Sequence, residues 1–153
     1  MYCFPQEFSV IDFLHPNVEM ALKDRRTRWG LGGCVQFRSQ EAFFSLEERD
    51  STECAVLAFL LHGMPIPESL KLVETARERF HHVLLLDYKV PERNLDFPAY
   101  WIGGWRERLG PHYRQYHHYM RHGGIEGLIR DLRLIPYRRD VFWGGGVGLL
   151  WLV

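Results

Sequence analysis

The chain has 153 residues, of which 46% are hydrophobic and 14% aromatic, so residues 1–153 are expected to form a single domain around a substantial core. Its 19 basic and 19 acidic side chains cancel at pH 7, which excludes a strong overall field for attracting nucleic acid or an anionic membrane surface. The expected partner is therefore a small molecule, with no nucleic acid and no membrane.

Cysteine usage and the start of the chain favour a cytoplasmic protein. The three cysteines are odd in number and form no CxxC pair, so we expect reduced thiols. The opening residues, MYCFPQEFSV, lack the basic flank and apolar core of a signal peptide. No apolar run approaches the roughly 20 residues needed to span a bilayer.

Strand and helix patterns alternate through the first part of the chain. Short apolar runs of β-forming residues at 8–13 and 34–37 predict two strands, and the segment that follows Pro16 predicts a helix that ends before glycines 30–33. The run ECAVLAFLL at 53–61 is apolar throughout, as expected of a strand that is covered on both faces.

A helix is predicted from Pro67 onward, because its apolar positions share one face: Leu70, Leu72, Val73 and Ala76. The run HVLLLDY at 82–88 then predicts another buried strand. This alternation has the spacing of βαβ units, so the expected class is α/β, with a mostly parallel sheet and flanking helices.

The character of the sequence changes over residues 91–132, where aromatic residues alternate with arginines and histidines. We expect a helical, aromatic-rich elaboration across one end of the sheet. Its aromatic side chains would line a substrate pocket if it folds over the strand ends, or serve as packing groups of a helical cap. Segments 134–142 and 147–153, joined by a glycine turn, predict a C-terminal antiparallel hairpin.

A histidine pair in the elaboration raises the question of a metal site. His118 and His122 have the i, i+4 spacing that places two imidazoles on one helical face. No carboxylate or cysteine in the surrounding sequence completes a ligand set, so no metal is expected.

Local motifs add a family resemblance. The segment VID at 10–12 resembles the second strand of class I S-adenosylmethionine-dependent methyltransferases, where an acidic residue at the strand end binds the ribose hydroxyls of the cofactor. The resemblance implies this role for Asp12, although Asp12 also fits a plain polar residue before a helix. It likewise implies that Glu41 and Ala42 lie beside the adenine.

The most specific match is VLAFLLHGMP at 56–65, which is similar to the fourth strand of that family and its His-x-Met-Pro end. The resemblance implies that the backbone at Ala58 and Phe59 meets the methionine part of the cofactor, and that His62 and Tyr88 face the methyl acceptor. An imidazole can act as a general base near neutral pH, but His62 could equally cap the strand end.

One departure from the family pattern matters. Class I methyltransferases have strand order 3-2-1-4-5-7-6 and begin with a strand that carries a glycine-rich cofactor loop, and no such segment precedes residue 8 here. The fold is therefore expected to be a truncated class I methyltransferase fold. Its second and fourth strands would lack their common neighbour. We therefore expect that the start of the chain is placed too late, that these two strands pair directly, or that the chain forms a homodimer.

Two functions follow from the resemblance. The first is an S-adenosylmethionine-dependent methyltransferase-like protein, possibly incomplete, that acts on a small molecule. The second is a non-catalytic methyltransferase remnant that serves as a self-associating or interaction module. Asp12 and His62-Gly63-Met64-Pro65 favour the first, and the missing glycine loop favours the second.

Overall fold

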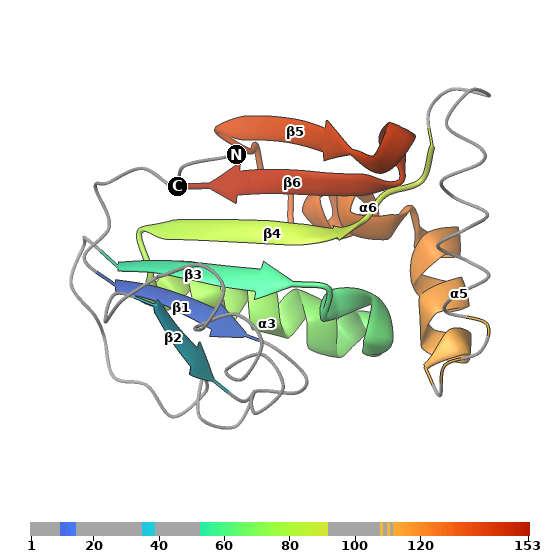
Figure 1. The fold of residues 1–153 in the computed structure, drawn as a ribbon, viewed down its shortest axis with the longest axis horizontal. Coiled ribbons are helices and arrows are strands. Elements are labelled where there is room, and N and C mark those ends of the chain that lie inside the picture. The colour runs from blue at the N-terminus through green and yellow to red at the C-terminus, as the bar shows by residue number, and fades with distance from the viewer. Residues whose placement is uncertain (1–9, 15–34, 39–52, 92–107, 109, 111) are drawn as a thin grey trace.

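A computed structural model of the chain describes residues 10–14, 35–38, 53–91, 108, 110 and 112–153. Within these ranges, one six-stranded sheet has the order β2-β1-β3-β4-β6-β5 (Figure 1). Its strands are β1 (Val10–Leu14), β2 (Val35–Arg38), β3 (Glu53–Ala58), β4 (His82–Tyr88), β5 (Arg138–Phe142) and β6 (Val147–Leu152).

The sheet confirms the predicted class and hairpin. Strands β1 to β4 pair in parallel, whereas β6 runs antiparallel to both β4 and β5. The last two strands therefore form the expected C-terminal hairpin on a mostly parallel sheet. The predicted bounds of β4 are the observed ones.

Two predicted strand bounds differ from the observed ones by three residues or more. Strand β3 ends at Ala58 rather than at residue 61, because Phe59 has a left-handed φ of 51° and Leu61–Gly63 then form a short 3-10 helix, η1. Strand β5 begins at Arg138 rather than at residue 134, because the backbone N–H of Leu134 donates to Ile129 in the turn that ends the preceding helix. Leu60 and Leu61 are apolar because they are buried in a turn, whereas Ile135 and Tyr137 before β5 are exposed.

Strand β1 pairs directly with β3. Asp12 lies opposite Ala55 on β3 and opposite Gln36 on β2, so the parallel ladder is continuous from β2 to β4. This is the direct pairing that the sequence raised as one of three possibilities. It leaves no unpaired backbone edge between β1 and β3, and the homodimer stays a prediction.

Three helices accompany the sheet in the described ranges: α3 (Ile66–Arg79), α5 (Tyr113–His122) and α6 (Gly124–Asp131). Helix α3 buries Leu72, Val73 and Ala76 as predicted, while Leu70 is only partly buried. Helices α5 and α6 lie within residues 113–131 of the predicted elaboration, and residues 92–107 lie outside the described part. No helix among the described residues is long and apolar enough to cross a bilayer.

Both faces of the sheet carry apolar side chains. Ala55, Leu57 and Leu85 belong to the core cluster that includes the buried faces of α3 and α6, and Figure 1 shows these helices behind the sheet. Cys54, Val56, Ala58 and Leu84 form a second cluster. Because side chains alternate along a strand, the two clusters lie on opposite faces.

The parallel strands end at one edge of the sheet, which we call the carboxyl edge. Turn η1 follows β3 there, α5 lies beyond it, and the turn η3 (Trp143–Gly145) joins β5 to β6 at the same edge (Figure 1). Ligands of open α/β sheets bind outside the carboxyl ends of the strands, so this edge is where a site is expected.

We predict that Gly124→Ala destabilises the fold by about 2 kcal/mol or more, because a left-handed residue would gain a clashing side chain. Gly124 has φ +63°, and a Cβ there would lie 2.7 Å from the carbonyl oxygen of Tyr88. Gly63→Ala is the control, since its Cβ would meet only the His112 side chain at 3.8 Å. Urea unfolding of both variants measures the difference, and equal stability would contradict the prediction.

Candidate functional site

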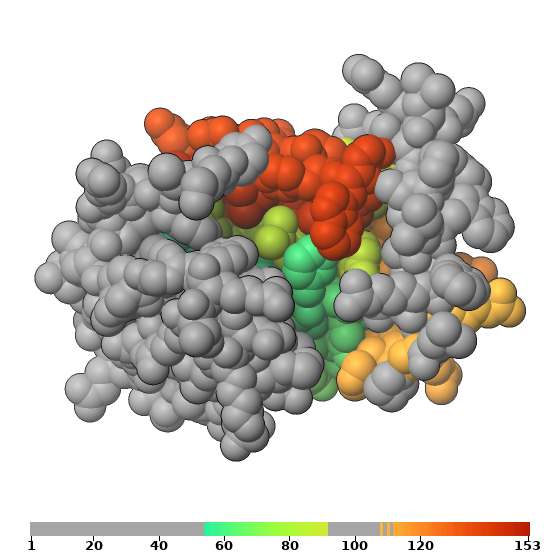
Figure 2. All heavy atoms as spheres, in the orientation of Figure 1, coloured from blue at the N-terminus to red at the C-terminus, as the bar shows by residue number. Residues whose placement is uncertain are grey.

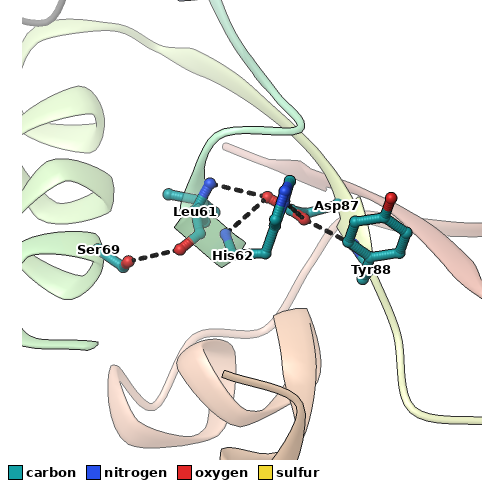
Figure 3. A network of polar contacts seen from close by, with 5 residues as sticks. All are labelled: Leu61, His62, Ser69, Asp87 and Tyr88. Carbon is teal, nitrogen blue, oxygen red and sulfur yellow. Dashed lines mark hydrogen bonds and ion pairs between the residues drawn. The ribbon is translucent and has the colours of Figure 1, made fainter. Parts of the chain in front are cut away.

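A fully buried carboxylate lies near the end of β4. Asp87 Oδ2 accepts hydrogen bonds from the backbone N–H groups of Leu61, at 2.8 Å, and His62, at 3.3 Å (Figure 3). Asp87 Oδ1 accepts the backbone N–H of Tyr88 at 2.7 Å. A buried carboxylate needs such donors, and here three backbone groups supply them. Asp87 therefore ties the η1 turn to the neighbouring strand.

His62 is held by the same carboxylate. Its Nδ1 lies 2.8 Å from Asp87 Oδ1, and its side chain is only 11% exposed. Because Asp87 already acts as the acceptor for three N–H groups, the natural tautomer of neutral His62 carries its proton on Nδ1 and its basic lone pair on Nε2. The hydroxyl of Ser69 donates to the carbonyl of Leu61 at 3.0 Å and fixes the other side of η1.

Three tyrosine rings surround the His62 imidazole. Ring centroids lie 4.7 Å away for Tyr88, 6.0 Å for Tyr116 and 6.5 Å for Tyr119, all in edge-to-face arrangements. Tyr88 and Tyr116 also contact each other at 5.1 Å. Such packing restricts rotation of the imidazole and lowers the local polarity, which strengthens its interaction with Asp87.

The hydroxyl of Tyr119 stands out within this cluster. Tyr119 is fully buried, and its hydroxyl has no hydrogen-bond partner among the described residues. Burial, followed by the negative charges of Asp87 and then Glu126, raises the pKa of this hydroxyl well above its usual value. The group therefore keeps its proton at neutral pH.

The end of β3 lies next to the cluster. Ala58 is buried, and the backbone N–H of Phe59 donates to the carbonyl of Leu86 at 2.8 Å. The Phe59 ring contacts Tyr88 at a centroid distance of 5.7 Å and Trp143 at 6.0 Å. The Phe59 N–H is therefore used in a hydrogen bond within the sheet. The backbone carbonyls here are acceptors, and their chemistry suits a ligand group that carries positive charge.

The structure brings part of the predicted site together. Ala58, Phe59, His62 and Tyr88 meet at the carboxyl edge. The resemblance places Asp12 at a strand end, but Asp12 lies in the middle of β1. The strand ends two residues later, because its pairing continues through Leu14. Glu41 and Ala42 lie outside the described residues, so their predicted roles stay predictions.

Asp87 is the important residue that the sequence reasoning missed. The signal was present, because Asp87 is the only acid in the otherwise apolar run VLLLDY. A carboxylate within a strand that is covered on both faces must find buried donors. What the sequence does not reveal is that those donors come from a turn 25 and 26 residues earlier.

The histidine pair of α5 has a different role from the one considered above. His118 is exposed, whereas His122 Nε2 lies 2.7 Å from the carboxylate of Asp131 and links α5 to α6. This carboxylate is near His122 because α6 folds back beside α5, but it pairs with His122 alone and completes no ligand set among the described residues. Among the described residues, no group of three or more metal-ligating side chains could hold an ion.

A hollow of about 300 Å³ lies at the opposite edge of the sheet. It is bordered by the end of α3, the start of β4 and the end of β6, with residues that include Arg77, His81 and Val153. None of its residues belongs to the His62–Asp87 cluster. The cluster, and not this hollow, occupies the edge at which open α/β sheets bind their ligands.

Solved structures of S-adenosylmethionine-dependent methyltransferases share this fold. The magnesium protoporphyrin IX methyltransferase of Synechocystis is 11% identical with TM-score 0.55, and the match covers 94% of this chain and 73% of that one. An O-methyltransferase family protein of Burkholderia thailandensis is 16% identical with TM-score 0.57, covering 96% and 51%. An O-methyltransferase family 2 protein of Planctomyces limnophilus is 14% identical with TM-score 0.53, covering 93% and 42%.

These comparisons establish the fold. The chain spans about half the length, or less, of the last two structures, and no protein-family model or curated protein matches its sequence. In the family's order, β2, β1, β3, β4, β6 and β5 correspond to strands 3, 2, 4, 5, 7 and 6. The described sheet is therefore a class I methyltransferase sheet without its central strand.

We predict that Asp87→Asn destabilises the protein by about 3 kcal/mol, because an amide N–H₂ group replaces an oxygen that must accept N–H donors in a buried site. Urea unfolding measures the loss. Asp140→Asn is the matched control, since Asp140 pairs with the exposed Arg138 and its loss is expected to change stability by about 1 kcal/mol at most. Equal effects would show that the Asp87 network is not a main constraint on the fold.

We predict that Tyr119→Phe stabilises the fold by about 1 kcal/mol at pH 7, because it removes a buried hydroxyl without a partner among the described residues. The unfolded hydroxyl ionises near pH 10, whereas the folded one has a raised pKa, so wild-type stability falls as pH rises above about 10.

The Tyr119→Phe advantage should therefore grow between neutral and alkaline pH in urea unfolding. Tyr137→Phe is the control, because Tyr137 is 74% exposed and its removal should have no such dependence. A loss of stability in Tyr119→Phe would instead mean that the hydroxyl makes a stabilising hydrogen bond.

Proposed function

We propose that this chain is an S-adenosylmethionine-dependent methyltransferase that acts on a small molecule, with His62 as the general base. The observation that carries the proposal is the buried His62–Asp87 pair at the carboxyl edge of a methyltransferase sheet. His62 Nδ1 lies 2.8 Å from Asp87 Oδ1. A base positioned by a carboxylate in a site of low polarity is suited to taking a proton from an acceptor.

The residues that would hold the cofactor lie along the carboxyl ends of the strands. Ala58, the last residue of β3, and the backbone carbonyls near Phe59 are proposed for the methionine part of the cofactor, whose ammonium group is a donor. Asp12 is proposed for the ribose, with Glu41 and Ala42 for the adenine. When bound, S-adenosylmethionine supplies an electrophilic methyl group on a sulfonium.

The acid–base role of His62 follows from its surroundings. Asp87 holds Nδ1, so the proton of a hydroxyl or amine acceptor would pass to Nε2 as the acceptor oxygen or nitrogen bonds to the methyl carbon. The bond from that carbon to the sulfonium sulfur would break in the same step and leave S-adenosylhomocysteine. Asp87 then stabilises the imidazolium. Tyr88, packed on His62, is proposed to face the acceptor.

The comparisons support the same reading. The Synechocystis structure is described with bound S-adenosylhomocysteine, and another matching structure is described in complex with S-adenosylmethionine. The Planctomyces limnophilus protein is described in complex with apigenin. We propose a small-molecule acceptor for this chain as well, and a cytoplasmic location in which its cysteines are reduced.

A second function is favoured by one observation. Strand β1 pairs directly with β3, so the place that the central strand holds in related sheets is closed among the described residues. A protein that no longer binds the cofactor would then be a methyltransferase remnant that serves as a self-associating or interaction module. The two functions differ in whether the cofactor binds.

Isothermal titration calorimetry of this chain with S-adenosylmethionine and S-adenosylhomocysteine tests the proposal. The catalytic function requires a dissociation constant in the micromolar range or below, which corresponds to about 8 kcal/mol of binding free energy. Absence of binding at millimolar ligand would reject it. Sedimentation velocity on the same sample would then show whether the chain self-associates.

We predict that His62→Gln lowers the rate of methyl transfer by about 100-fold to 1,000-fold, because it removes the base but leaves the cofactor's contacts in place. Formation of S-adenosylhomocysteine is measured with a panel of small phenols and amines. The affinity for S-adenosylhomocysteine should change by less than about twofold. The exposed His118→Gln serves as control, and equal activity in the two variants would exclude His62 as the base.

A further inference from the structure

The turn that carries His62 depends on contacts from outside itself. Turn η1 follows the end of β3, which Figure 2 shows in green beside the C-terminal hairpin in red. The two bonds that close the turn, from the N–H groups of Gly63 and Met64, are each 3.2 Å long. Short 3-10 turns have poor hydrogen-bond geometry, so η1 is not expected to fix the direction of His62 alone.

The peptide group between Leu61 and His62 is held at both of its ends. Its carbonyl oxygen, which belongs to Leu61, accepts the hydroxyl of Ser69 at 3.0 Å (Figure 3). Its N–H, which belongs to His62, donates to Asp87 Oδ2 at 3.3 Å. A trans peptide group is planar, and its C=O and N–H point in opposite directions. The two anchors therefore fix the orientation of this plane, and with it the direction in which the His62 side chain leaves the backbone.

The Ser69 hydroxyl makes a bond that its own helix does not supply. Ser69 is fully buried near the start of α3, and its hydroxyl also lies 3.3 Å from the carbonyl of Pro65. That carbonyl already accepts the backbone N–H groups of Glu68 and Ser69, each at 3.0 Å. A hydroxyl has one proton to donate, so the shorter contact to Leu61 is the bond that links α3 to η1.

Loss of this hydroxyl should leave α3 folded. Alanine has a higher helix propensity than serine and would bury no hydroxyl. The Leu61 carbonyl would still accept the N–H of Met64, so it would keep a donor. The effect of removing the hydroxyl should therefore appear in the orientation of His62 rather than in the unfolding of α3.

We propose that Ser69 is a positioning residue, whose hydroxyl orients the Leu61–His62 peptide group so that the imidazole keeps Nδ1 on Asp87 and its lone pair on Nε2. This inference rests on the proposed function, in which Nε2 of His62 takes the proton. It adds α3 to the elements that hold the base, since Asp87 comes from β4. Ser69 acts through η1 rather than on the acceptor.

The test is NMR of the isotope-labelled His62 ring in the whole chain, which reports the tautomer and needs no cofactor. The spectrum of His62→Gln identifies the signal. The variants are Ser69→Ala, which removes the hydroxyl, and Ser69→Cys, which keeps nearly the same shape but is a weak donor. Thr75→Ala is the control, because Thr75 is a partly buried hydroxyl residue of the same helix. Methyl transfer to the panel of phenols and amines is measured in the same proteins.

The ratio of the Nδ1–H to the Nε2–H tautomer should fall about 3-fold to 10-fold in Ser69→Ala and Ser69→Cys, the range that one hydrogen bond supplies. The ratio should be unchanged in Thr75→Ala. In both Ser69 variants kcat should fall by the same factor, while KM for S-adenosylmethionine should change by less than about twofold.

Ser69→Ala decides the test, and Ser69→Cys replaces it if the alanine variant does not fold. An unchanged tautomer ratio would overturn the inference, as would a changed ratio with unchanged kcat. Failure of both variants to fold would also overturn it, because Ser69 would then be a requirement of the fold. A changed ratio in a chain that does not bind S-adenosylmethionine would support the positioning role and reject the proposed function, so the two failures are distinguishable.

Discussion

The buried carboxylate of Asp87 is the constraint on which the carboxyl edge depends. Removing an ionisable group from water costs several kcal/mol unless donors replace the lost solvation, and here the donors are three backbone N–H groups and an imidazole. Asp87 lies on β4, in the interior of the sheet. Since three of these four donors belong to η1, the carboxylate determines where the chain goes after β3.

The direct pairing of β1 with β3 sets how far apart the predicted cofactor residues Asp12 and Ala58 lie. The register sets Asp12 opposite Ala55, three positions before Ala58. At about 3.3 Å per residue, the two predicted cofactor residues are separated by roughly 10 Å along the strand direction. A single ligand that contacts both residues must therefore extend along β3. It must reach farther from the strand ends to contact Asp12 than to contact Ala58.

Much of this fold could be predicted from local patterns. The run at 82–88 and the glycine turn before Val147 each predict their structure from a few neighbouring residues. Strand β4 and the C-terminal hairpin are observed at these places. Predictions failed where apolar residues are buried in turns, as at Leu61, because a continuous apolar run does not show where a strand ends.

The candidate site was predictable only in part for a related reason. His62 belongs to the recognisable motif His62-Gly63-Met64-Pro65, so its place at the carboxyl edge was predicted. The role of Asp87 depends on contacts across 25 residues or more, and the left-handed backbone of Trp143 depends on the turn that contains it. Neither long-range donors nor backbone conformation can be read from residue types alone.

Asp87 binds donors of η1 and would be needed for folding whether the chain is an enzyme or a remnant. Trp143 adds a cost in either case, because left-handed backbone at a non-glycine residue costs roughly 1–2 kcal/mol. Its indole stacks on Phe59 and is 65% exposed, so burial offsets only part of that cost. Neither residue depends on the cofactor for its place in the fold, so binding of S-adenosylmethionine is the property that separates the two functions.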